Sequence, residues 1–242
     1  MPEKRESLSD FNRPSTRPCC WGLPGWICTC GKHWQDILRP GEIIIDVGAN
    51  IGFTVHRFFS ILRGLCNIYA FEPNPRISQY PEANTRALNS MRVSFVQKAV
   101  GNRNGRVAFI DNRNHGALSK LTLLREDDPF GPKYWTRFDE YEVDMVTLDS
   151  LIETHPGVHP SFVKIDVEGA GAMVLEGAIS VLKSIGPTVT CEFHSEKEKE
   201  DMIRILEECR YSGLVCPRKG VPDETHMSFV HLSNPRLQPS VI

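Results

Sequence analysis

The sequence IIIDVGANIG at residues 43–52 decides how the rest of the chain is interpreted. A short apolar run that stops at glycines predicts a buried strand followed by a tight turn. After the second glycine, Val55, Phe58, Phe59 and Leu62 recur at the spacing of one helix face. The stretch therefore predicts a strand, a glycine turn and a helix, a unit in which a ligand can approach backbone that a Cβ would otherwise block.

An acidic residue follows the next apolar run. Residues 67–71 predict a second strand, and Glu72 comes directly after it, at 72 − 52 = 20 positions beyond Gly52. A carboxylate at about this offset binds the ribose hydroxyls of an adenosine in nucleotide-binding α/β folds. We therefore expect a nucleoside-containing cofactor between the glycine turn and the end of the second strand. Its predicted binding residues are Asp46, Gly48, Ala49, Asn50, Gly52, Glu72 and Asn74.

The charge of Asp46 separates two classes of cofactor. Gly48 and Gly52 stand alone in this turn, so the three-glycine fingerprint of dinucleotide-binding proteins is not met. Asp46, close before the turn, would repel a pyrophosphate and attract an ammonium or a sulfonium group. S-adenosylmethionine carries both of these cations and no phosphate, so it is the cofactor that we expect. A nucleotide-dependent oxidoreductase is the alternative.

Short apolar runs and helix-period segments alternate along the rest of the chain, which predicts repeated βα units around a mostly parallel sheet. Residues 93–100 and 106–110 flank the turn GNRNG and predict a hairpin. Residues 111–140 have no regular period and predict an inserted loop near the working face. Ser195 and Glu198 form the capping-box pattern of a following helix. Further strands are predicted at residues 141–148, 162–167, 188–193, 214–216 and 228–232.

Four motifs occur in the order that is typical of one enzyme family. They are DVGANIG at residues 46–52, YAFEPNP at 69–75, TLDSL at 147–151 and KIDVEGA at 164–170, followed by Glu192 and His194 at the end of a strand. Through these motifs, from about residue 42 to about residue 195, the chain resembles the FkbM-type S-adenosylmethionine-dependent methyltransferases.

This resemblance implies an α/β, Rossmann-like class I methyltransferase fold, with a seven-stranded, mostly parallel sheet and helices on both faces. It also implies S-adenosylmethionine as the cofactor and O-methylation of a hydroxyl on a sugar or other small metabolite as the activity. The chain departs from the family pattern at Gly171, because KIDVEGA is usually followed by Glu. The sequence therefore does not show which residue makes the substrate-side or helix-capping contact expected of that Glu. A non-catalytic S-adenosylmethionine-binding module is therefore a second alternative.

The candidate catalytic residues lie at strand ends. Ligands of open α/β sheets bind beyond the carboxyl ends of the strands, which places Asp46, Glu72, Asp166 and His194 on one rim. Methyl transfer from a sulfonium is an in-line displacement, and a hydroxyl nucleophile benefits from a base that removes its proton. Asp166, Glu168 and His194 are the candidates for this base, and the ordinary pKa of histidine, about 6.5, suits the role near neutral pH.

Each candidate also has a structural role open to it. His194 precedes a capping serine and can orient that turn, and Glu168 can stabilise the N-terminus of the next helix. Asp166 can serve the cofactor or the substrate rather than the proton. Lys164, inside a strand, is expected to pair with a carboxylate, because an unpaired buried ammonium is costly.

Composition limits the partners. The chain has 242 residues, of which 40% are hydrophobic and 24% charged, and this excludes a disordered chain and a disulfide-dependent miniprotein. The net charge of −2 argues against nucleic acid as a partner, and no segment approaches the ~20 apolar residues of a membrane span. The N-terminus lacks the apolar core of a secretory signal. We therefore expect a cytoplasmic enzyme with a small-molecule acceptor, and neither nucleic acid nor a membrane as partner.

The same patterns predict the domain organisation. We expect a disordered leader at residues 1–20, a Cys/Trp-rich segment at 21–41 that packs on the domain, and a methyltransferase domain at 42–242. No metal site is predicted at the N-terminal cysteines near His33, because their spacing lacks two CxxC pairs. These cysteines are Cys19, Cys20, Cys28 and Cys30.

Overall fold

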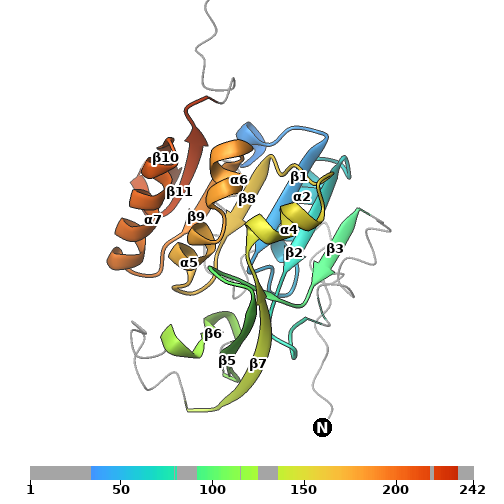
Figure 1. Cartoon of the computed structure of the whole chain (residues 1–242), viewed down its shortest axis with the longest axis vertical. Coiled ribbons are helices and arrows are strands. Elements are labelled where there is room, and N and C mark those ends of the chain that lie inside the picture. Colours follow the sequence, from blue (N-terminus) through green and yellow to red (C-terminus); the bar gives the residue numbers. More distant parts are fainter. Residues whose placement is uncertain are drawn as a thin grey trace, which may run out of the picture.

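The computed structural model describes residues 34–78, 80, 92–114, 116–124, 136–218 and 221–233. Its centre is a seven-stranded sheet in the order β10-β11-β9-β8-β1-β2-β3 (Figure 1). The strands are β1 (Glu42–Val47), β2 (Cys66–Phe71), β3 (Val93–Val96), β8 (Phe162–Ile165), β9 (Thr188–Glu192), β10 (Tyr211–Arg218) and β11 (Val221–His231). Neighbouring strands from β3 to β9 are parallel, whereas β11 runs antiparallel to both β9 and β10. The prediction of a mostly parallel seven-stranded sheet is confirmed.

Helices cover both faces of this sheet (Figure 1). They are α2 (Phe53–Ile61), α4 (Leu148–Thr154), α5 (Gly171–Glu176), α6 (Ile179–Ser184) and α7 (Glu196–Glu208). Successive residues of a strand point to opposite faces, so Ile44 packs in the apolar cluster of α2 and Ile45 in that of α5, α6 and α7. Both side chains are fully buried. This explains why residues 43–47 are apolar at every position except Asp46.

The described end of the N-terminal segment packs against α2. Trp34 is buried with its ring 4.8 Å from that of Phe58, and Leu38 lies in the same cluster. The leader at residues 1–20 and the cysteines near His33 lie outside the described residues. The division of the chain into leader, segment and domain therefore stays a prediction.

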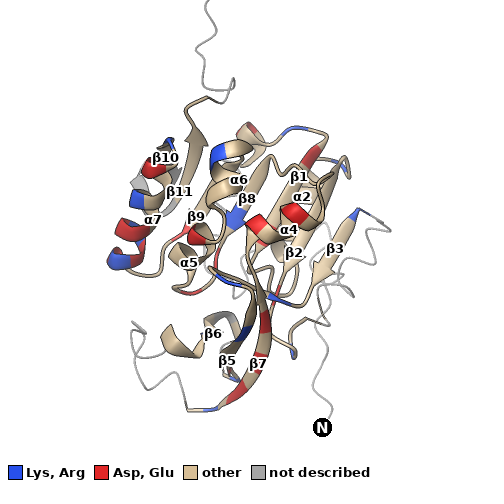
Figure 2. Ribbon diagram, in the orientation of Figure 1, with Lys and Arg blue, Asp and Glu red and all other residues tan. Residues whose placement is uncertain are grey.

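Charged residues of both signs are interspersed over the molecule. Figure 2 shows acidic and basic residues together on α7. It also shows acidic residues along β7, next to basic residues of neighbouring segments of the same chain. The net charge of −2 thus arises from nearly equal numbers of acidic and basic residues, which lie side by side in this view. Within the described ranges, no helix combines the length and the apolarity needed to cross a membrane.

A second sheet of four strands lies below the first in Figure 1. Its order is β4-β7-β5-β6, with β4 (Ala99–Val100), β7 (Phe138–Val146), β5 (Gly105–Asn112) and β6 (Lys120–Leu121). Strands β5 and β7 pair antiparallel from Gly105 opposite Met145 to Asn112 opposite Phe138. Val107, Phe109 and Met145 pack in a third apolar cluster, which gives this sheet a core of its own.

The predicted hairpin between residues 93–100 and 106–110 is wrong. Residues 93–100 are divided between β3, which pairs with β2, and β4, which pairs with β7. The partner of β5 is β7 instead, because the apolar residues of β7 complete the third cluster. The turn between β4 and β5 therefore joins two strands that lie on either side of β7.

The segment predicted as an inserted loop contributes to this second sheet. Strand β6 and the ends of β5 and β7 fall within residues 111–140. Two 3-10 turns, η2 (Gly116–Leu118) and η3 (Thr122–Leu124), flank β6. Residues 125–135 lie outside the described residues. Short strands thus occur in a segment whose sequence shows no regular period.

Candidate active site

A pocket opens where the carboxyl ends of β1, β2 and β8 meet the second sheet. This is the position at which open α/β sheets bind their ligands. Six of the predicted site residues border it: Gly48, Ala49, Asn50, Glu72, Asp166 and Glu168. The other four do not: Asp46, Gly52, Asn74 and His194.

The glycine turn is shaped by close packing of the backbone. Gly48 has a φ of 80°, and a Cβ at this position would lie 1.8 Å from the backbone oxygen of Asp166. Its N–H and that of Ala49 both donate to the carbonyl of Phe71, at 3.0 and 2.9 Å. Gly52, with a φ of 86°, is the N-cap of α2. Gly48 is therefore required where the end of β1 packs between β2 and β8, and because it also borders the pocket, its expected role in the approach of a ligand stays a prediction.

Glu72 is held by the turns on either side of it. Its Oε2 accepts the N–H of Asn50 at 2.9 Å, and its Oε1 accepts the N–H of Asn74 at 2.8 Å. Burial raises the pKa of Glu72 to about 7, although these two N–H groups act in the opposite direction. Each carboxylate oxygen has a second lone pair, so Glu72 can accept further hydrogen bonds from a ligand in the pocket.

Asp46 is fully buried, and its charge is matched by Lys164. The Nζ of Lys164 lies 3.2 Å from Asp46 Oδ1 and 3.3 Å from Asp166 Oδ2, and it donates to the carbonyl of Gly48 at 2.8 Å. Burial lowers the pKa of Lys164, but Asp166 and Asp46 raise it above its ordinary value. The expected ion pair of Lys164 is confirmed. Asp166 and Glu168, together with Glu72 and without Asp46, are the carboxylates at the wall of the pocket.

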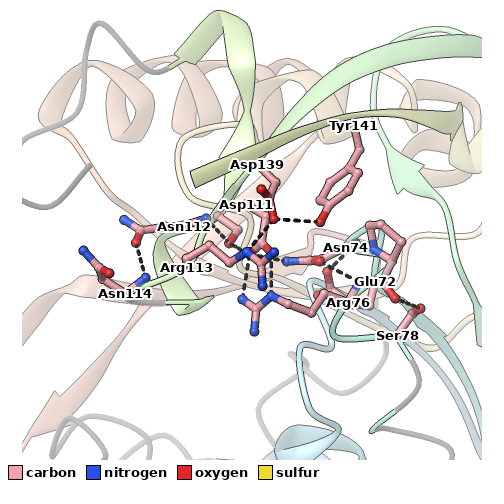
Figure 3. Close-up of polar contacts among 12 residues, drawn as sticks. Glu72, Asn74, Arg76, Ser78, Asp111, Asn112, Arg113, Asn114, Asp139 and Tyr141 are labelled. Carbon is pink, nitrogen blue, oxygen red and sulfur yellow. Dashed lines mark hydrogen bonds and ion pairs between the residues drawn. The ribbon is translucent and has the colours of Figure 1, made fainter. Parts of the chain in front are cut away.

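Asn74 belongs to a buried network that joins the two sheets (Figure 3). Its Nδ2 donates to Asp111 Oδ1 at 2.8 Å. Arg76 donates to both oxygens of Asp111, at 2.6 and 2.8 Å, and Ser119 Oγ donates to Oδ1 at 3.0 Å. Burial by itself raises the pKa of Asp111, but Arg76 and Asn74 hold it below its usual range. We call these four residues the Asp111 network, and they tie β5 to the turn that carries Glu72.

His194 lies among four carboxylates. Its Nε2 is 3.4 Å from Glu168, 3.6 Å from Asp166 and 3.8 Å from Glu192, and its Nδ1 is 3.5 Å from Glu198. Burial lowers the pKa of His194, but Glu168 and Glu198 raise it well above its ordinary value. The pKa of His194 thus departs from the ordinary value on which its expected role as a base depends, and that role stays a prediction.

Glu198 accounts for the departure at Gly171. Its Oε1 accepts the N–H of Gly171, and its Oε2 accepts the N–H of His194, each at 2.8 Å. A Cβ at position 171 would lie 2.4 Å from Met202 Sδ. Ser195 Oγ accepts the N–H of Glu198 at 3.1 Å, as the capping-box pattern predicts. A carboxylate from α7 thus makes the contact at the start of α5 that the sequence left open.

The second sheet supplies a wall of the pocket whose residues include Phe109, Ser119, Lys120 and Leu121, with Lys98 next to β4. Residues 111–140, which the sequence places near the working face, include three of them, but no sequence pattern identifies any residue of this wall individually. Phe109 lies within the predicted strand at residues 106–110, but residues 107–110 are all apolar, so the sequence does not show which of them face the pocket. Strand β6 has two residues, too few to show any period.

Comparison with known proteins agrees with this geometry. Residues 46–212 match the family model of the methyltransferase FkbM domain. The 2-O-methyltransferase NoeI of Sinorhizobium fredii is 30% identical over 149 residues, which are 60% of this chain and 60% of NoeI. The hexuronic acid methyltransferase AglP of Haloferax volcanii is 26% identical over 191 residues, 74% of this chain and 70% of AglP.

Among solved structures, a methyltransferase FkbM from Methylobacillus flagellatus is similar in fold. The TM-score is 0.58 at 19% identity, and the match covers 79% of this chain and 44% of that chain. The chain thus spans 60% of the length of NoeI and less than half of this solved structure.

Proposed function

Because this chain belongs to the FkbM methyltransferase family, we propose that it transfers a methyl group from S-adenosylmethionine to a hydroxyl group of a sugar. The observation that carries the proposal is the pocket, with Glu72 at the glycine turn and Asp166 and Glu168 at the end of β8. The names of two relatives support the acceptor class, since NoeI is a 2-O-methyltransferase and AglP a hexuronic acid methyltransferase.

The residues of the pocket fit S-adenosylmethionine. Glu72 offers two carboxylate oxygens to the ribose hydroxyls, and the rings of Phe53 and Phe71 provide apolar surface beside the turn. Asp166 and Glu168 place negative charge on the opposite wall, where a sulfonium is favoured. When bound, this cofactor supplies an electrophilic methyl group attached to a positively charged sulfur.

Glu168 is the residue to which we assign the proton of the acceptor hydroxyl. Asp166 also borders the pocket, but its carboxylate is paired with Lys164 at 3.3 Å. Glu168 has no such ion pair with a lysine or arginine in the part of the chain that the structure describes, and its carboxylate lies 3.4 Å from His194 Nε2. Glu168 takes the proton that the hydroxyl loses while its oxygen is methylated.

Hexuronic acids are the first acceptors to test. AglP acts on this class by its name, and two lysines, Lys98 and Lys120, border the pocket. An ammonium group can form a charge-assisted hydrogen bond with a sugar carboxylate. We therefore expect acceptors with a carboxylate to be methylated faster than the matching neutral hexoses.

The experiment combines cofactor binding with product detection. Calorimetric titration of the full chain with S-adenosylmethionine, S-adenosylhomocysteine and NAD should show binding of the first two. Mass spectrometry of a hydroxylated sugar library should then show products heavier by one CH₂ unit. Binding of NAD alone would favour an oxidoreductase, and cofactor binding without any product would favour a non-catalytic module.

A further inference from the structure

Three side chains with metal-binding atoms meet at the ends of two neighbouring strands. Asp166 follows β8, and Glu192 and His194 lie at the end of β9, with Ile165 paired to Cys191 in the strand register. One ligand atom from each of the three side chains lies within 4.8 Å of the others. The parallel pairing of β8 and β9 thus brings two carboxylates and an imidazole to one point beside the pocket.

The surroundings of the His194 imidazole favour a further ligand. Both of its ring nitrogens are buried, and neither has a hydrogen-bond partner among the residues that the structure describes. The nearest carboxylate oxygens, at 3.4 to 3.8 Å, lie beyond the range of about 2.7 to 3.2 Å that is usual for N–H···O hydrogen bonds. A buried polar atom without such a partner is rare in native proteins and calls for a water, an ion or another group.

The spacing suits a shared ion. Two atoms that each lie about 2.1 Å from one octahedral cation are separated by about 3 Å at right angles and about 4.2 Å across the ion. The separations of His194 Nε2 from Asp166 and Glu192, 3.6 and 3.8 Å, lie between these two values. Small rotations of the three side chains would therefore bring them to a common ion.

The charge of the cluster also favours a cation. Glu168 and Glu198 add two more carboxylates around the same imidazole. Lys164 lies near one member of the group, Asp166, and shares its positive charge between Asp166 and Asp46. Side-chain exposures of 13 to 21% for His194, Glu192, Glu168 and Asp166 mean that water screens these charges incompletely.

We propose that Asp166, Glu192 and His194 bind one divalent metal ion beside the acceptor pocket. A mixture of carboxylate and imidazole ligands suits Mn²⁺, which accepts both donor types, and Mn²⁺ is therefore the probe. The ion's role rests on the proposed function: Asp166 borders the pocket, so the ion can bind the acceptor hydroxyl and make its proton easier for Glu168 to remove. The hydroxyl oxygen then forms its bond to the methyl carbon as the sulfur–methyl bond breaks.

The site is tested on the full chain, purified with a chelator and titrated with Mn²⁺ alone. Electron paramagnetic resonance of free Mn²⁺ should show one saturable site per chain. Glu192→Gln and His194→Ala should weaken this binding at least tenfold. The matched controls are Glu196→Gln, whose side chain is 85% exposed, and His159→Ala, which is also exposed, and both should bind as the wild type does. Mn²⁺ is a hard ion, so it does not report the N-terminal cysteines, which prefer soft metals.

Absence of saturable Mn²⁺ binding by the wild-type chain overturns the site, whether or not the variants fold. Binding that Glu192→Gln and His194→Ala leave unchanged, in variants with wild-type circular dichroism, also overturns it. Methyl transfer gives a separate answer. If transfer continues at full rate in excess chelator, the ion has no role in transfer. If Mn²⁺ binds as expected and no acceptor is methylated, the site stands and the proposed function fails.

Discussion

The two sides of the pocket are built differently. On the side of β1 and β2, the oxygens of Glu72 have backbone N–H partners at 2.8 and 2.9 Å. On the side of β8 and β9, His194 lies 3.4 to 3.8 Å from four carboxylates, and within the described part of the chain neither ring nitrogen has a hydrogen-bond partner. Backbone hydrogen bonds fix the Glu72 carboxylate in place before a ligand binds. The side chains around His194 are held by charge, so we expect their positions to change when a ligand or an ion binds. We therefore expect the Glu72 side to determine cofactor affinity and the His194 side to determine turnover.

The largest effect is expected at Gly48, where the two sides touch. Gly48→Ala would place a Cβ 1.8 Å from the Asp166 backbone oxygen, at a φ of 80° that L residues rarely adopt. We expect a loss of about 4 kcal/mol in the free energy of unfolding, measured by urea denaturation. The matched control is Gly157→Ala, since nothing lies within 4 Å of its added Cβ. Equal stability of the two variants would contradict the tight packing described at Gly48.

Substitution of the pocket carboxylates on the His194 side should separate turnover from affinity. Glu168→Gln and Asp166→Asn keep the shape of each side chain and remove its charge. We expect kcat to fall by about 100-fold or more, because Glu168 is the proposed base and Asp166 a proposed ligand of the ion that binds the acceptor hydroxyl, while the Kd for S-adenosylmethionine rises by only about fivefold through the loss of one charge near the sulfonium. Calorimetric titration and a turnover assay on the same preparations measure the two quantities. A loss of affinity as large as the loss of kcat would show that cofactor affinity and turnover are not determined separately by the Glu72 side and the His194 side.

The pH dependence of stability should locate the buried charge on the Glu72 side. The pKa of Glu72 in the folded protein, about 7, lies above its ordinary value of 4.5, so the folded chain binds more protons between these values than the unfolded chain does. The stability contributed by the protonated group is complete below pH 4.5 and is lost as the pH rises through about 7. Between about pH 5 and about pH 8, the free energy of unfolding should therefore fall by on the order of 2 kcal/mol relative to Glu72→Gln. Urea denaturation of both proteins across this range measures the difference, and a constant difference would be the contrary result.

The smallest effect is expected for Glu72→Gln on cofactor affinity. The amide retains one acceptor oxygen and loses the other, so the Kd for S-adenosylmethionine should rise about tenfold. Because the His194 side is intact, kcat at saturating cofactor should remain close to that of the wild type. Glu153→Gln, an exposed position on α4, serves as the control. Unchanged affinity in Glu72→Gln would remove the ribose assignment.

Sequence patterns predict the Glu72 side better than the His194 side, because its signals are local. Gly48 and Glu72 are each placed by a strand–turn unit, and the two units are consecutive in the chain. Both residues border the pocket. The surroundings of His194 depend on contacts between elements that are distant in the sequence, since Glu198 reaches it from α7. They also depend on the backbone of Glu168, whose left-handed φ of 50° no sequence pattern predicts. The ordinary pKa of histidine was therefore a poor guide to this site.

The second sheet was misread for a similar reason. The turn GNRNG favours a hairpin of its flanking strands, yet β4 and β5 both pair with β7, which begins 138 − 112 = 26 positions after the end of β5. Local turn chemistry cannot report this long-range choice, because it depends on which apolar residues complete a common core. Phe109 and Met145 lie in that core.

The Asp111 network also has a consequence for protein engineering. It anchors β5 to the turn of Glu72, and β5 in turn pairs along its whole length with β7. Strand β6 pairs with β5, so the part of the pocket wall at Lys120 and Leu121 is tied to the cofactor side. Substitutions at these two positions would therefore vary the acceptor wall on a constant cofactor-binding scaffold.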